Sequence, residues 1–226
     1  MSIGYDTVLK RLREERKRLN WTQEEMSQKL WLTQSHYNKI ENGFKRLSYR
    51  ELQRLNEIGV DVYHILTGKR IENPFSEEYF KNCNDLAATA LCQITYAVLS
   101  ALSRMEKNIS ETGRRITNTS YILSNRSTGK SLWLLLRDCN NLKQTQMAEI
   151  IKIDVKKYRK LEQKLLLPDS EIIFQTCDCF QVSPFLFLDE RGFAIKEIYS
   201  ILCEVDHDTR NALFDYLELG YSKFMI

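Results

Sequence analysis

The stretch TQEEMSQKLWLTQSHYNKIENG, residues 22–43, constrains the fold of this chain more than any other. Thr22 is followed three residues later by Glu25, which is a capping box and predicts a helix that begins there. Thr33 is a good N-cap for a second, shorter helix, which an Asn-Gly pair ends. Two short helices joined by a tight turn are therefore expected here.

The second of these helices has an apolar side and a polar side. Tyr37 and Ile40 lie three residues apart, so they share one face and are predicted to anchor the helix to its domain. The outward side chains are then Gln34, Ser35, Asn38 and Lys39. Amide and amine groups of this kind can pair with the edges of adenine or guanine.

The surrounding sequence completes a small bundle. Residues 5–19 alternate apolar and charged positions at helical spacing, Ser48 with Glu51 forms another capping box, and Asp61 caps a last helix that stops at Gly68. Only 3 prolines and 8 glycines interrupt the whole chain, and 43% of its residues are hydrophobic. These features predict an all-α fold in a globular, ordered chain.

The second half of the chain repeats the first at an offset of 121 residues. The matched pairs are Arg16 with Arg137, Asn20 with Asn141, Gln23 with Gln144, Met26 with Met147, Tyr37 with Tyr158, Lys39 with Lys160, Ile40 with Leu161 and Glu41 with Glu162. One residue is added later, so that the segment VSPFLFL takes the place of the fifth helix. Eight matches at one offset predict a second, divergent copy of the same unit.

The expected architecture is two five-helix, repressor-like domains joined by a long helical linker and followed by a helical C-terminal tail. The predicted segments are 1–72 for the first domain, 73–128 for the linker, 129–190 for the second domain and 191–226 for the tail. Within the linker, residues 109–130 mix Ser, Thr, Asn and Gly and are interpreted as a connector.

The linker also contains a long apolar helix. Between residues 76 and 108, an apolar seam runs at three- to four-residue spacing through Leu91, Ile94, Val98, Ala101 and Met105. Residues 86–103 carry no charge, which is typical of a membrane span, but several Thr, Gln and Ser side chains make the segment too polar for one. We therefore expect a homodimer formed through residues 76–108, and no membrane partner.

Helix, three-residue turn and helix is the sequence form of a helix-turn-helix. With its caps, its ENG ending and the basic loop FKR, residues 5–68 resemble the DNA-binding domain of phage repressors and Xre-type bacterial regulators; 131–189 resemble it more loosely. The resemblance implies a sequence-specific, cytoplasmic, bacterial or phage-encoded transcriptional regulator that binds double-stranded DNA. The helix 33–42 would lie in the major groove.

The resemblance also assigns roles to residues. The expected DNA-binding residues are Thr22, Gln23, Thr33, Gln34, Ser35, Asn38, Lys39, Lys45 and Arg46 in the first unit, and Gln144, Lys156, Lys157, Arg159 and Lys160 in the second. Two structural ion pairs are expected, Arg16 with Glu41 and Arg137 with Glu162. The charges of the second unit suit phosphates more than bases, so this unit could bind DNA loosely, read another half-site or only pack.

The sequence departs from the family pattern at its turns. The family usually has glycine where Trp31 and Lys152 stand, and the second unit has Lys164 in place of the closing glycine. A side chain resists positive φ, so each helix-turn-helix turn is expected to be strained or differently wound.

Other function classes have weaker support. The net charge is only +3, although residues 1–75 hold 14 Lys and Arg against 10 Asp and Glu. We find no phosphate-binding loop, nucleophile motif or metal-ligand spacing, so neither an enzyme nor a cofactor or metal site is predicted. The alternative function is an antitoxin-like regulator that binds and silences a partner protein, with the apolar C-terminal tail contacting a protein or peptide.

Overall fold

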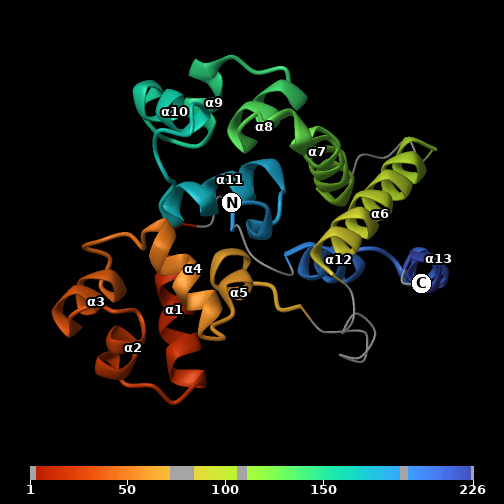
Figure 1. The fold of residues 1–226 in the computed structure, drawn as a ribbon. Helices are drawn as coiled ribbons and strands as arrows, with labels where there is room; N and C mark the ends of the chain where they lie inside the picture. Colours follow the sequence, from red (N-terminus) through yellow and green to blue (C-terminus); the bar gives the residue numbers. More distant parts are fainter. Residues whose placement is uncertain (1–3, 72–83, 106–110, 189–192, 225–226) are drawn as a thin grey trace. The chain divides into compact units, whose positions relative to one another are not determined.

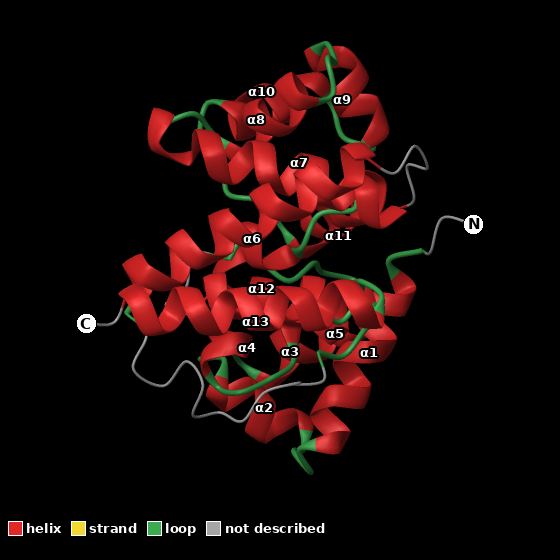
Figure 2. Ribbon diagram, turned by 90° about the vertical axis from the view of Figure 1, so that its right-hand side faces the viewer, coloured by secondary structure: helices red, strands yellow, loops and turns green. Residues whose placement is uncertain are grey.

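The computed structural model describes residues 4–71, 84–105, 111–188 and 193–224. These residues form thirteen α-helices and two short 3-10 helices, with no strand among them (Figure 2). The all-α prediction is therefore confirmed for the described part of the chain. Two compact units are present: the first combines Met1–Arg70 with Gln144–Cys179, and the second combines Ile71–Lys143 with Phe180–Ile226. The domain boundaries expected from sequence stay predictions.

The first unit begins with five helices (Figure 1). They are α1 (Asp6–Arg18), α2 (Gln23–Lys29), α3 (Gln34–Glu41), α4 (Tyr49–Glu57) and α5 (Val62–Thr67). The predicted caps are confirmed, since Thr22 and Ser48 each close a capping box and Asp61 accepts from the backbone N–H of His64. The core side chains that are fully buried include Leu12, Met26, Tyr37, Ile40, Leu52, Leu55 and Ile65. These caps and apolar faces bring α2 and α3 together beside α1.

The same unit contains α9 (Gln144–Ile150), α10 (Val155–Glu162) and α11 (Ser170–Phe180). Both α9 and α10 begin and end 121 residues after α2 and α3. The left-handed backbone positions recur as well. At the offset of 121 they are Asn20 and Asn141, Trp31 and Lys152, and Gly43 and Lys164. The local backbone of the two segments is thus the same, although most of their side chains differ.

In the turn between α2 and α3, Trp31 has a left-handed backbone conformation although it is not glycine. Trp31 has φ 56° and Lys152 has φ 55°, a conformation that costs a non-glycine residue roughly 1–2 kcal/mol. In the first turn, the guanidinium of Arg54 lies 4.0 Å from the centre of the Trp31 ring. Arg54 also donates to the carbonyl of Lys29 at 3.0 Å. The strain expected at this position is therefore present, and Arg54 offsets part of it.

The second unit is built around α6 (Asp85–Met105). Its other described helices are α7 (Glu111–Asn125), α8 (Leu132–Cys139), α12 (Phe193–Leu202), α13 (His207–Phe224) and the 3-10 helices Arg126–Thr128 and Pro184–Leu186. Helix α6 packs against α7, α12 and α13. In this core, Glu197 accepts from Tyr96 and, at 3.0 Å, from Arg115. A buried carboxylate with two donors fixes the relative positions of three helices.

Helix α6 is long and apolar enough to cross a membrane by length and composition alone, and 39% of its apolar window is buried within the protein. The predicted pairing seam is partly wrong, because Leu91 is 2% exposed and faces the core of its own unit. Ala101 is exposed, and Ile94 and Val98 are half-buried. Residues 76–83 and 106–108 of the predicted pairing helix lie outside the described residues.

Two further sequence interpretations need correction. Residues 111–125, expected to be a connector, form α7. Its apolar side chains Ile116 and Leu123 are buried, and this packing stabilises the helix. The hydroxyl of Thr117 donates to the carbonyl of Gly113, so this polar residue is accommodated within the helix. The segment VSPFLFL forms only one turn of 3-10 helix, which Ser183 caps at Phe185.

Candidate nucleic-acid interface

Helix α3 has the two-faced character that its sequence predicts. Tyr37 and Ile40 are fully buried, so the helix is fixed to the domain by its inner side. Thr33 caps it by accepting from the N–H of His36 at 3.2 Å. Among the predicted DNA-binding residues of this region, the exposed ones are Thr22, Thr33, Gln34, Ser35, Asn38 and Lys39. A short, rigidly held helix with an amide-rich outer face is suited to reading base edges.

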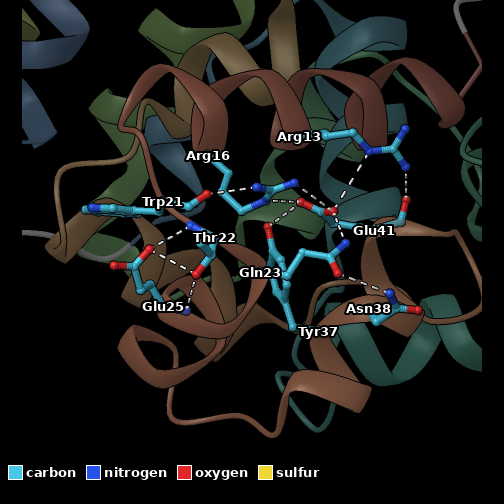
Figure 3. Close-up of polar contacts among 9 residues, drawn as sticks. All are labelled: Arg13, Arg16, Trp21, Thr22, Gln23, Glu25, Tyr37, Asn38 and Glu41. Atoms are coloured by element: carbon cyan, nitrogen blue, oxygen red, sulfur yellow. Dashed lines mark hydrogen bonds and ion pairs between the residues drawn. The ribbon is translucent and has the colours of Figure 1, made fainter.

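Glu41, at the end of α3, holds the domain together (Figure 3). Its carboxylate is buried and accepts from Arg16 at 2.7 and 3.3 Å. It also accepts from Gln23 Nε2 at 2.8 Å and from the Tyr37 hydroxyl at 2.8 Å. Burial acts to raise the pKa of Glu41, but these hydrogen bonds outweigh it and the pKa lies below its ordinary value. The carboxylate therefore stays charged and joins α1, α2 and α3.

Gln23 connects this network to the outer surface. While its amide nitrogen donates to Glu41, its amide oxygen accepts from Asn38 Nδ2 at 3.2 Å. Asn38 in turn accepts from Asn42 at 2.8 Å. Figure 3 shows the bond between Asn38 and Gln23 and the bond from Gln23 to Glu41. A residue expected to touch a phosphate and one expected to read a base are thus oriented by the same buried carboxylate.

The loop after α3 carries the two basic residues predicted to brace the DNA backbone. Lys45 is exposed. Arg46 is half-buried and forms a bidentate pair with Glu171 of α11, at 2.7 and 3.4 Å. Hydrogen bonding to Glu171 raises the pKa of Arg46 above its ordinary value. No local sequence pattern predicts Glu171 as the partner of Arg46, because the two residues are 125 positions apart.

The second segment repeats the network with other outer residues. Gln144 donates to Glu162 at 2.9 Å and accepts from Arg159 at 3.2 Å, as Gln23 does with Glu41 and Asn38. The outer side chains Lys156, Arg159 and Lys160 are exposed, and Lys157 pairs with Asp169 at 3.4 Å. Arg137 donates to the carbonyl of Leu142 at 3.1 Å, and its pairing with Glu162 stays a prediction.

No group of three or more His, Cys, Asp or Glu side chains that could hold a metal ion occurs in the described part of the chain. The exposed side of α3 instead presents hydrogen-bond donors and acceptors, which can bind the polar groups of a ligand.

Comparison with known families agrees with this geometry for one part of the chain. The model of the helix-turn-helix family matches residues 12–58, and it detects no second copy. Neither the curated proteins nor the solved structures give a match. Residues 12–58 therefore form an Xre-type helix-turn-helix domain, which indicates a DNA-binding transcriptional regulator.

Proposed function

We propose that this protein is a sequence-specific transcriptional regulator that places α3 in the major groove of double-stranded DNA. The observation that carries the proposal is the division of α3 into a buried, ion-paired inner side and an exposed, amide-rich outer side within a matched helix-turn-helix domain. Bases would be read by Gln34, Ser35, Asn38 and Lys39. Backbone contacts would come from Thr22, Gln23, Thr33 and Lys45.

We further propose that α9 and α10 form a second, divergent helix-turn-helix. Support comes from the matching helix bounds, the recurring left-handed positions and the repeated Gln–Glu–donor network. Its outer charges, Lys156, Lys157, Arg159 and Lys160, suit phosphates, so this head would add affinity more than specificity.

Two chains acting together would explain the outer side of α6. Leu86 is 81% exposed and Leu102 is 45% exposed, and both lie in the uncharged stretch 86–103 of this helix. Pairing through residues 76–108 would give a homodimer, whose recognition helices would read half-sites about 34 Å apart. The regulator would act in the cytoplasm of a bacterium or of a phage-infected cell.

A second candidate function draws on the C-terminal tail. Tyr216 and Leu219 of α13 are 45% and 60% exposed. An exposed apolar strip of this kind can bind a protein or peptide. A partner-silencing protein would use this strip and would not depend on the outer residues of α3.

The test is selection of binding sites from a random duplex pool by the full-length protein at near-physiological salt. Wild type should enrich one sequence. Gln34→Ala should relax one position of that sequence and lower affinity about tenfold or more, because a good bidentate contact contributes about 1–3 kcal/mol.

Glu14→Ala is the matched control, since Glu14 is exposed on α1, and it should leave the selected sequence unchanged. Failure of wild type to enrich any sequence, with binding that vanishes as salt rises, would overturn the proposal. Partner capture through α13 would then be the function to pursue.

A further inference from the structure

The loop after α3 exposes an apolar ring. Phe44 is 83% exposed, and no large apolar side chain in the described residues is more so. It directly follows Gly43, the left-handed residue that ends the helix at φ 79°. A single exposed aliphatic residue needs no explanation, but a phenyl ring beside a recognition helix exposes apolar area that a ligand could cover.

Hydrogen bonds to backbone carbonyls hold the backbone of this loop in place. The N–H groups of Phe44 and Lys45 both donate to the carbonyl of Lys39, at 2.9 and 3.2 Å. Arg46 donates to the carbonyl of Gly43 at 3.0 Å. These bonds close the loop against the end of α3, and the side chain of Phe44 lies on the outside of the loop.

Helix α11 fixes the other end of the loop. The N–H of Ser170 donates to the carbonyl of Leu47 at 2.9 Å, and Glu171 holds Arg46 in the bidentate pair. The Arg46 guanidinium also lies 4.3 Å from the centre of the Tyr5 ring. Because Tyr5 covers one face of the guanidinium and its N–H groups are bound to Glu171 and Gly43, we assign Arg46 as a positioning residue for the loop. Lys45 is then the basic residue of the loop that stays exposed.

The loop after α10 has the same arrangement. Leu165, 121 residues after Phe44, is 73% exposed and donates its N–H to the carbonyl of Lys160 at 2.8 Å. It follows Lys164, which is left-handed at φ 60° as Gly43 is. Two segments with different outer helix faces thus share an exposed apolar side chain at the same backbone position, next to a lysine.

The charges nearby indicate what covers the ring. Lys39 and Lys45 are exposed on either side of Phe44 in sequence, and they favour an anionic surface. Duplex DNA has such a surface, with apolar deoxyribose faces between its phosphates. We infer that Phe44 packs against deoxyribose at the edge of the groove that α3 enters, while Lys45 contacts the adjacent phosphate. This inference rests on the proposed function and adds an apolar contact to it.

The test compares Phe44→Ala and Lys45→Ala with wild type on the duplex that wild type selects. Phe44→Ala should lower affinity about tenfold at every salt concentration, because the lost contact is apolar. Lys45→Ala should reduce the slope of log affinity against log salt by about 0.9, because one phosphate contact is lost. In hydroxyl-radical footprints, Phe44→Ala should expose one or two deoxyriboses and leave the remaining protection intact.

Phe44→Leu should restore most of the affinity, and both Phe44 variants should unfold at the wild-type temperature because the ring is exposed. Unchanged affinity and footprint in Phe44→Ala, with wild type still binding its selected site, would overturn the inference and leave the proposed function standing. A photoreactive group placed at position 44 that crosslinks to a protein partner instead of DNA would also overturn the inference. Absence of specific binding by wild type would overturn both.

Discussion

The segments around α2–α3 and α9–α10 have the same backbone and different surfaces. Their helices start and end at one offset, their turns are left-handed at the same places, and a glutamate at the end of each second helix accepts from a glutamine at the start of the first. Asn38 stands on the outer side of one and Arg159 on the other. The buried side chains and the Gln–Glu hydrogen bonds therefore maintain the backbone of the motif, while the outer residues can change with the ligand.

The largest expected difference between the segments is in stability. Removing the partner of a buried Arg by Glu41→Ala should cost about 3–5 kcal/mol, because an uncompensated charge is left inside. Glu162 is half-buried, so Glu162→Ala should cost about 1 kcal/mol. Hydrogen exchange of the α3 and α10 amides would measure both. Equal losses would show that burial does not distinguish the two networks.

The second prediction separates base reading from phosphate attraction. Asn38→Ala should relax the selected sequence at one position and cost about 1–3 kcal/mol of specific binding. Arg159→Ala should leave the selected sequence unchanged and lower the salt slope by about 0.9. Salt titrations on selected and scrambled duplexes would reveal these effects. A sequence change in Arg159→Ala would mean that the second segment also reads bases.

The third prediction concerns the left-handed turns. Lys152→Gly should stabilise the protein by about 1 kcal/mol, because glycine adopts positive φ without steric cost. Trp31→Gly should gain less, since it gives up the stacking of Arg54 on the ring, which contributes about 0.5–1 kcal/mol. Urea unfolding of the two variants would compare them. A larger gain for Trp31→Gly would contradict the role of Arg54.

The smallest effect is on pH dependence. The folded-state pKa of Glu41 lies below its ordinary value of 4.5, so its contribution to stability is present above that value and is lost as pH falls through the lowered folded-state pKa. Wild type and Glu41→Gln should therefore have stabilities that converge as the pH is lowered below 4.5. Acid unfolding curves would test this, and parallel curves would show that Glu41 keeps an ordinary pKa.

The sequence predicted what depends on local chemistry. The caps at Thr22, Thr33 and Ser48 are visible in residues three apart, and the inner side of α3 follows from the spacing of Tyr37 and Ile40. The pairing of Arg16 with Glu41 came from family resemblance, because nothing in spacing alone brings residues 25 apart into contact.

What sequence reasoning missed depends on distant or collective packing. Helix α7 looked like a connector, since its Ser, Thr and Asn residues favour turns unless buried neighbours such as Ile116 stabilise a helix. Glu171 could not be assigned to Arg46, because the two are joined only when α11 docks. The exposure of Phe44 likewise follows from a closed loop and not from its residue type.

The most direct measurement of the central claim is methylation protection on the selected duplex at near-physiological salt. Dimethyl sulfate attacks guanine N7 in the major groove and adenine N3 in the minor groove. With α3 in the major groove, wild type should protect a discrete set of guanines, and Asn38→Ala should weaken that protection. Protection of adenine N3 alone, or none at any guanine of a bound site, would contradict the account.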